Sequence, residues 1–254
     1  PDEIQRKDLR INDVVIVRRA GDVIPEVVSP IKERRDGTQS EWKMQKFCPC
    51  GENEIEFVNE EKVPRCSGNY ECVIAKKEML IYFGSKSGLD IEGLGKETVE
   101  TLIENNLVNS YEDFYSLNYK ELISLPQWKD KKTRNLLDAI QNSIKAEPIK
   151  ILSALGIRYV GKQTAKLLIN KFGSINAIFE SNKDEVEKIH GISSSVANSL
   201  IDWYALDTNK SLLSKFSKIG FRLNEVVKSS SGKLNGKTFP IFFRLFSFCC
   251  LLRR

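Results

Sequence analysis

The sequence predicts a mainly α-helical fold in which pairs of helices joined by tight turns are repeated, preceded by a four-cysteine finger and by part of a β-barrel. Three observations support this fold class. Similar turn segments recur at intervals of 34, 32 and 32 residues. Apolar residues follow a helical period between about residues 76 and 226, and four cysteines fall within 25 residues just before that region.

Composition places the chain among ordinary globular proteins, since 41% of its 254 residues are hydrophobic and 29% are charged. No apolar run approaches the roughly 20 residues of a membrane span, so we expect no membrane association. The net charge of +5 includes Arg244, Arg253 and Arg254 near the C-terminus; without them, 36 basic residues face 34 acidic ones. Bulk charge therefore barely favours a nucleic-acid partner, and any such surface must come from local placement of charge and backbone amides.

Residues 1–45 are expected to form the end of a small β-barrel followed by a linker. Val14 to Val17 form a β-branched run, Gly21-Asp22 predicts a turn, and Pro25 is expected to end a strand or lie at a sheet edge. The segment is too short to close a barrel. The charged N-terminus lacks an initiator Met, which is typical of a chain cut from a longer protein.

Residues 46–75 hold a cysteine cluster with the spacing Cys-x-Cys-x15-Cys-x5-Cys. Turn-forming residues lie beside each pair, as four thiolates around one structural zinc ion require. The absence of a secretion signal favours metal over disulfides and indicates a reducing cytoplasm. Free or disulfide-bonded cysteines remain the alternative, and the single residue between the first two is tighter than the usual Cys-x-x-Cys. The predicted ligands are Cys48, Cys50, Cys66 and Cys72.

Residues 76–228 contain four copies of the pattern apolar-x-Gly-apolar-Gly-x-x-x-small, each followed by an amphipathic helix. Glycine suits a turn where φ is positive or where a ligand must approach the backbone. The free N–H groups of the following helix can then bind an anion such as a DNA phosphate, without regard to base sequence. This is the helix-hairpin-helix pattern of non-specific DNA-binding proteins. The copies lie at residues 91–99, 125–133, 157–165 and 189–197.

The copies differ in how well they keep the pattern. The second, Gln127-Trp128-Lys129, has lost both glycines, so we interpret it as structural, with Trp128 in the core. Ordinary helix pairs that only pack a domain remain the alternative for all four copies. The predicted DNA-binding residues are Gly93, Gly95, Lys96, Gly161, Lys162, Gly191 and Ser193.

Residues 229–254 are predicted to be a linker and the start of a further domain that is truncated or frameshifted. A Ser/Gly-rich hinge precedes Leu-Asn-Gly-Lys-Thr-Phe, after which the chain becomes rich in Phe and Leu and carries no acidic residue. A genuine apolar tail that binds a partner is the alternative.

The order of these modules resembles the C-terminal part of bacterial NAD-dependent DNA ligases, in which an OB fold, a zinc finger, a helix-hairpin-helix domain and a BRCT domain follow the nucleotidyltransferase domain. The resemblance covers residues 1–239. It is carried by Arg6-Lys-Asp-Leu-Arg-Ile-Asn-Asp13, Val17-Arg-Arg-Ala-Gly-Asp-Val-Ile-Pro25, Phe47-Cys-Pro-Cys-Gly51, Leu89-Asp-Ile-Glu-Gly-Leu-Gly95, Leu152-Ser-Ala-Leu-Gly-Ile-Arg-Tyr-Val-Gly161 and Gly232-Lys-Leu-Asn-Gly-Lys-Thr-Phe239.

The resemblance implies an enzyme that forms a lysyl-AMP from NAD, with magnesium, transfers AMP to the 5′-phosphate of a nick, and seals the nick. The adenylated lysine of that family lies in Lys-x-Asp-Gly, which this chain lacks. We therefore expect no catalytic residue and no bound NAD or magnesium here, and a fragment that holds nicked duplex DNA. The missing nucleotidyltransferase part is an expected partner. Whether Asp8, Arg10 and Asp13 assist adenylation or only form a barrel turn stays open.

Two other functions remain as alternatives. A stand-alone DNA-binding scaffold would carry the same hairpins and finger without ligase ancestry. A helix-hairpin-helix nuclease or glycosylase would need a metal-carboxylate cluster or a catalytic Lys/Asp pair, and Asp90 and Asp130 have no matching partners in the sequence. His190, the only histidine, lies inside a hairpin and is interpreted as structural.

Overall fold

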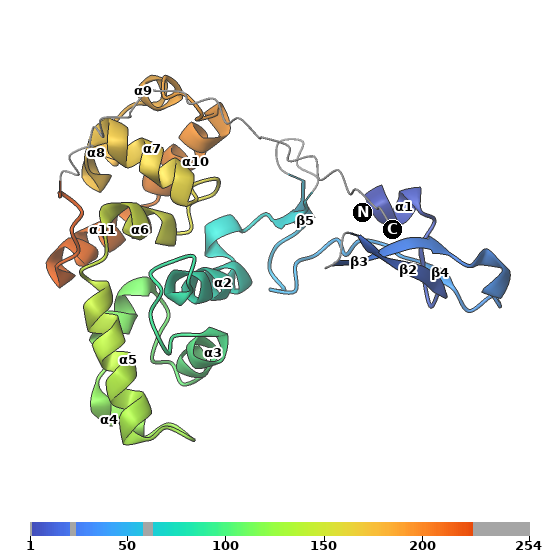
Figure 1. Cartoon of the computed structure of the whole chain (residues 1–254), viewed down its shortest axis with the longest axis horizontal. Coiled ribbons are helices and arrows are strands. Elements are labelled where there is room, and N and C mark those ends of the chain that lie inside the picture. The colour runs from blue at the N-terminus through green and yellow to red at the C-terminus, as the bar shows by residue number, and fades with distance from the viewer. Residues whose placement is uncertain (1, 21–23, 58–62, 226–254) are drawn as a thin grey trace, which may run out of the picture.

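The computed structural model describes residues 2–20, 24–57 and 63–225. Within these residues the chain is mainly helical, with three two-stranded sheets near the N-terminus, which confirms the predicted fold class. None of the described helices combines the length and the apolar character needed to cross a bilayer. Figure 1 shows the N-terminal residues 2–41 at one side, the cysteine-bearing segment in the middle and the helices of residues 73–225 at the other side.

The N-terminal part consists of a short helix and two antiparallel strand pairs. Arg10 of β1 pairs with Glu41 of β4, and β2 and β3 form a longer ribbon with a bulge at Ile16/Val17. Pro25 does not end a strand but lies inside β3 opposite Arg19, in a two-stranded sheet. Each strand of such a sheet is an edge strand, which tolerates a missing donor, so the second of the two expected positions is the one observed. The elements are α1 (Asp2–Arg6), β1 (Arg10–Ile11), β2 (Val15–Ala20), β3 (Ile24–Pro30), η2 (Lys32–Arg34) and β4 (Ser40–Glu41).

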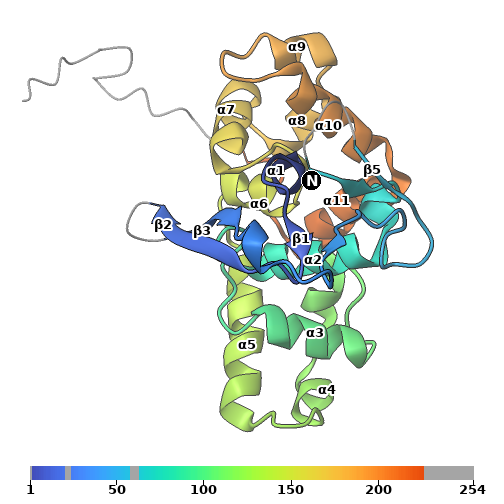
Figure 2. The ribbon, with the colours of Figure 1, turned by 90° about the vertical axis from the view of Figure 1, so that its right-hand side faces the viewer.

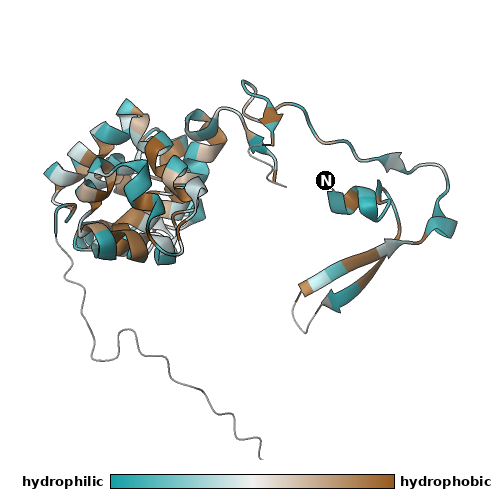
Figure 3. Ribbon diagram, turned by 90° about the horizontal axis from the view of Figure 1, so that it is seen from above, coloured by the Kyte–Doolittle hydropathy of each residue, from teal (hydrophilic) through white to brown (hydrophobic). Residues whose placement is uncertain are grey.

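This part lacks a core of its own. Ile16, Val17 and Ile24 on the ribbon are about half-exposed or more, and Figure 3 shows the brown, hydrophobic stretch of β2 and β3 away from the helices of residues 73–225. The ribbon is thus a piece of a sheet, as the sequence predicted for a barrel too short to close. The turn predicted at Gly21-Asp22 lies outside the described residues.

The cysteine-bearing segment is nearly free of regular structure. It contains β5 (Ile55–Glu56), β6 (Arg65–Cys66) and η3 (Asn69–Glu71), and Ile55 pairs with Cys66. Among its described residues only Cys48 and Cys72 are buried, while Phe47 and Phe57 are about half-exposed.

Most helices of the remaining described residues are arranged as the four predicted pairs, and η4, α8 and α11 lie outside these pairs. Hairpin 1 consists of α2 and α3, hairpin 2 of α4 and α5, hairpin 3 of α6 and α7, and hairpin 4 of α9 and α10, and the two helices of each pair are in contact. The bounds are α2 (Val73–Gly84), α3 (Lys96–Glu104), η4 (Tyr111–Ser116), α4 (Tyr119–Ile123), α5 (Asp130–Ser143), α6 (Pro148–Ala154), α7 (Lys162–Phe172), α8 (Ile175–Glu180), α9 (Lys183–Glu187), α10 (Ser194–Ala205) and α11 (Asp207–Ile219).

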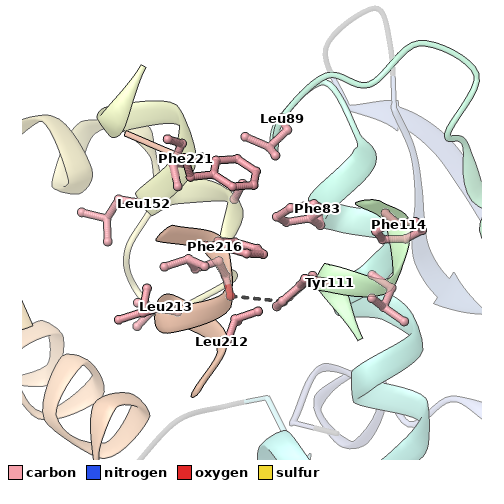
Figure 4. Close-up of a cluster of buried hydrophobic side chains, with 14 of the residues drawn as sticks. Phe83, Leu89, Tyr111, Phe114, Leu152, Leu212, Leu213, Phe216 and Phe221 are labelled. Carbon is pink, nitrogen blue, oxygen red and sulfur yellow. Dashed lines mark hydrogen bonds between the residues drawn. The ribbon is translucent and has the colours of Figure 1, made fainter. Parts of the chain in front are cut away.

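One continuous core joins all four hairpins, running from Leu80 to Leu223. Its centre is an aromatic group in which Phe83 of α2 packs against Tyr111 and against Phe216 of α11, with ring centroids 4.6 and 5.9 Å apart. The Tyr111 hydroxyl donates a hydrogen bond to the Leu155 carbonyl at 3.2 Å (Figure 4). Figures 1 and 2 both place hairpins 1 and 2 towards one end of the helical part and hairpins 3 and 4 towards the other.

The structure bears on some boundaries but not on all. Helices α3 and α7 begin at Lys96 and Lys162, within the repeated pattern at 91–99 and 157–165 rather than after it as expected. The predicted linker and aberrant domain start at 229–254 lie outside the described residues. The division into 1–45, 46–75, 76–228 and 229–254 stays a prediction.

Candidate metal centre and nucleic-acid interface

The four predicted cysteine ligands converge on one point. Their sulfur atoms all lie within 4.8 Å of one another. The Cys48–Cys72 and Cys50–Cys66 sulfur pairs are each 3.9 Å apart, well beyond the ~2.05 Å of a disulfide bond. Sulfurs at the corners of a tetrahedron with Zn–S bonds of about 2.3 Å would be about 3.8 Å apart, so the donor set and its spacing fit a four-coordinate zinc ion.

Local backbone geometry explains how so short a spacing can serve one site. The Gly51 N–H donates to the Cys48 carbonyl at 2.9 Å, and Gly51 has φ +84°, which reverses the chain within the first pair. The Cys48 N–H donates to the Asn53 carbonyl at 2.8 Å. Both cysteines of the tight Cys-x-Cys pair therefore face the cluster. The last predicted ligand, Cys72, is also the N-cap residue of α2 and connects the finger to the helices.

The electrostatics of the cluster favour a bound cation. Backbone N–H donation from Glu52 and the Asn53 side chain lower the pKa of the Cys50 thiol to about 6, and the Asn53 amide nitrogen lies 3.6 Å from that sulfur. Burial raises the pKa of the Cys66 thiol to about 12. Four thiolates this close would repel each other strongly, and a divalent metal supplies the compensating charge while it displaces the remaining protons.

The four hairpin turns share one backbone conformation. In each, the N–H of the apolar residue donates to the carbonyl three residues earlier, at 3.0 Å for Leu94 to Ile91 and for Val160 to Ile157. The residue at the first glycine position has positive φ in every copy, including the two copies without glycine. These residues are Gly93 (84°), Gln127 (66°), Tyr159 (62°) and Gly191 (89°).

The second glycine position marks the start of a helix in every copy. It is the N-cap residue of α3, α5, α7 and α10, occupied by Gly95, Lys129, Gly161 and Ser193. None of these four residues accepts a side-chain capping bond, whereas Asn118 and Asn182 cap α4 and α9, the first helices of hairpins 2 and 4, and Ser174 caps the intervening α8. The first N–H groups of the second helices thus remain available to an external acceptor.

Glycine is favoured at the two positions of the pattern for different physical reasons. Gly95 and Gly161 have φ of −81° and −86°, which any residue can adopt, and a Cβ built on either would meet nothing within 4 Å. Both residues are exposed. Glycine at this position therefore serves neither the turn nor the packing, and it leaves the backbone open to close approach from outside.

This contrast predicts different results for two substitutions in hairpin 1. Gly93→Ala is expected to lower the free energy of unfolding by about 1 kcal/mol, because an L-residue at positive φ is strained. Gly95→Ala is expected to change it by less than about 0.5 kcal/mol, because φ is compatible and the unfolded chain loses entropy, while alanine is less favourable than glycine at an N-cap position. Urea unfolding of both variants measures the difference. Equal losses for the two variants would contradict the assignment of the turn.

The predicted DNA-binding residues are all exposed, at the turns and first helical turns of hairpins 1, 3 and 4. The structure also brings hairpins together in pairs. A Cβ on Gly93 would lie 3.6 Å from Leu136 of α5, and one on Gly191 would lie 3.6 Å from Leu167 of α7. Hairpin 1 therefore abuts hairpin 2, and hairpin 4 abuts hairpin 3. Trp128 of hairpin 2 is buried, as predicted.

An ion-pair network near the N-terminus was missed by sequence reasoning. Arg35 donates from Nε and Nη2 to the two carboxylate oxygens of Asp13, at 2.8 Å each, and from Nη1 to Asp8 at 3.1 Å. Lys32 and Arg35 lower the pKa of Asp8 to about 2, and Arg35 lowers that of Asp13. Both carboxylates are thus engaged in holding η2 against the turn after α1, and no spacing rule would have revealed partners 22 and 27 residues apart.

Comparison with known proteins matches three parts of this architecture. A model described as the NAD-dependent DNA ligase OB-fold domain matches residues 1–39, one described as a SAM-like helix-hairpin-helix tandem matches 89–142, and one described as a helix-hairpin-helix motif matches 150–213. The last two ranges contain the turns of hairpins 1 and 2 and of hairpins 3 and 4.

Whole-chain relatives cover nearly all of these residues. A DNA ligase of Salinibacter ruber is 35% identical over 237 residues, 93% of this chain and 34% of the relative. A DNA ligase of Pelotomaculum thermopropionicum is 36% identical over 243 residues, 94% of this chain and 36% of the relative. The chain therefore spans about a third of the length of these relatives.

Proposed function

Because the chain belongs to the NAD-dependent DNA ligase family, as a C-terminal portion of such an enzyme, we propose that it holds nicked duplex DNA for ligation. The contacts are made by the hairpins, chiefly through Gly93, Gly95, Lys96, Gly161, Lys162, Gly191 and Ser193. The finger holds one zinc ion in a structural role. Adenylation and sealing belong to a nucleotidyltransferase domain such as the family possesses.

One observation carries the proposal. The second helix of every hairpin begins without a side-chain cap. In each copy the N-cap residue occupies the same position of the repeat and follows the same hydrogen-bonded turn. Unsatisfied N–H groups and the positive end of the helix dipole attract anions. The three helix starts that carry predicted DNA-binding residues, those of α3, α7 and α10, suit a ligand that presents phosphates repeatedly, and the contact is independent of base sequence.

A binding titration tests this function. The chain is expected to bind duplex DNA of unrelated sequences with equal affinity, more tightly when the duplex carries a nick, and less tightly as salt rises, because phosphate contacts release counterions. Fluorescence anisotropy with nicked and intact duplexes of the same sequence, at several salt concentrations, measures all three properties. Sequence-dependent binding, or no binding at low salt, would refute the proposal.

The division of labour yields a prediction about covalent chemistry. Purified alone and incubated with NAD and magnesium, the chain is expected to form no AMP adduct, since it contains no Lys-x-Asp-Gly. The nearest match, Arg34-Arg35-Asp36-Gly37, has Arg34 at the position of the motif lysine. Labelled NAD followed by denaturing gel analysis provides the measurement, with a complete ligase of the family as the positive control. A labelled band from this chain would show that it carries an adenylation site of its own.

A further inference from the structure

Hairpin 2 keeps the turn of the other hairpins although it has lost both glycines. The Trp128 N–H donates to the Leu125 carbonyl at 3.2 Å, and Gln127 takes the positive φ. Helix α5 then starts at Lys129, without a side-chain cap. The difference lies at the N-cap position, where a lysine side chain replaces the open backbone of Gly95 or Gly161. A phosphate cannot approach this backbone as closely as it can approach a glycine.

The same helix start gathers three exposed lysines. Lys129 and Lys131 have no ion-pair partner within the described part of the chain. Lys132 lies over the Trp128 ring with its Nζ 4.3 Å from the centroid. The nearby acid, Asp130, is already engaged, since the Arg134 Nε donates to it at 2.8 Å. The first turn of α5 thus presents positive charge at the end of a helix where a cation is intrinsically unfavourable.

These lysines line a surface hollow of about 500 Å³ between hairpins 1 and 2. Gly93, Gln127, Lys129, Lys131 and Leu136 contribute to its walls, with Glu92 as the acidic member. The hollow therefore begins at the turn of hairpin 1 and ends at the lysines of hairpin 2. Its position makes it continuous with the surface on which the proposed function places the DNA backbone.

We infer that this hollow is a phosphate site of the DNA backbone, in which the ammonium groups of Lys129 and Lys131 replace the backbone amides that serve hairpins 1 and 3. The inference rests on the proposed function and assigns a binding role to the hairpin that the sequence pattern indicated to be structural only. A lysine is a flexible point charge that reaches a phosphate several ångströms away. Hairpin 2 therefore contacts the phosphate at longer range than its glycine-bearing neighbour does.

The salt dependence of binding separates this site from the others. For duplex DNA, the slope of log K against log salt changes by about 0.9 for each phosphate neutralised. Lys129→Gln/Lys131→Gln is expected to reduce the steepness of that slope by about 1 to 2, with no loss of thermal stability. The control Lys210→Gln/Lys218→Gln removes the same charge from α11, which belongs to no hairpin, and is expected to leave the slope unchanged. Lys129→Arg/Lys131→Arg is expected to retain the parent slope.

Failure of this inference can be distinguished from failure of the proposed function. A parent chain that does not bind the duplex would overturn both. A parent that binds, together with a Lys129→Gln/Lys131→Gln variant whose slope equals that of the α11 control, would overturn the inference alone. A reduced slope for this variant and a parental slope for the arginine variant would establish hairpin 2 as a charge-dependent phosphate contact.

Discussion

Removal of the proposed zinc ion is expected to unfold the finger while the helices stay folded. Among its described residues only Cys48 and Cys72 are buried, so the finger has no apolar core to hold it. Four thiolates around zinc supply folding free energy on the order of 10 kcal/mol. Under reducing conditions, chelation should therefore raise amide hydrogen exchange in the described finger residues, 46–57 and 63–72, by several orders of magnitude. The amides buried around Phe83 and Phe216 should remain protected.

Metal analysis of variants defines the ligands. The parent is expected to hold one zinc ion per chain, and Cys50→Ser/Cys66→Ser is expected to hold none. Cys249→Ser/Cys250→Ser changes the two cysteines outside the cluster and serves as the matched control, with full metal content expected. Binding should weaken as pH falls, because the metal competes with protons for the sulfurs. A stoichiometry near zero in protein prepared without chelator would contradict the site.

Covering the exposed backbone at the N-cap glycines of two hairpins with larger side chains is expected to weaken DNA binding while the fold is retained. Gly95→Val/Gly161→Val places β-branched side chains where φ is ordinary and where a Cβ would meet nothing within 4 Å. The fold is therefore expected to persist, at a cost of about 1 kcal/mol for valine at each N-cap position. From outside, however, the valine side chains obstruct the N–H groups at the starts of α3 and α7. A hydrogen bond to a charged group contributes about 1.5–3 kcal/mol, so losing one at each hairpin should raise Kd by about 100-fold or more.

A matched control separates obstruction from a general effect of valine on helices. Ser214→Val introduces the same side chain at an exposed position of α11 and is expected to bind like the parent. Thermal unfolding of all three proteins checks that the fold is intact. If the double glycine variant folded and bound as tightly as Ser214→Val at several salt concentrations, the hairpin amides would not be the phosphate contacts.

Much of the helical architecture could be predicted because one clear copy of a repeated pattern shows where the corresponding residues of the other copies lie. The spacing of the copies located the turn before α5, α7 and α10, even where glycine had been replaced by lysine or serine, although α7 itself begins earlier than the sequence indicated. Trp128 was correctly assigned to the core for the same reason. The cysteine spacing likewise indicated a cluster, since turn residues beside each pair bring the sulfurs together.

Other features depend on contacts that leave no periodic signal. The sequence did not show that Gln127 and Tyr159 adopt positive φ, because nothing in their residue types requires it; the surrounding turn imposes it. The bonds from Arg35 to Asp8 and Asp13 join distant residues of an irregular segment. The abutment of hairpin 1 on hairpin 2, and with it the hollow beside the lysines, arises from packing between repeats rather than within one.

The continuous core between the hairpin pairs has a consequence for avidity. Since Phe83, Tyr111 and Phe216 join the two pairs in one packed body, no flexible linker has to be ordered when the second pair meets its phosphates. Once one pair has bound the duplex, the other pair is held near its own phosphates at high effective concentration. Two weak contacts then give slow dissociation of the whole complex. Loosening that core, for example by Phe216→Ala, should accelerate release of the duplex although Phe216 itself is fully buried.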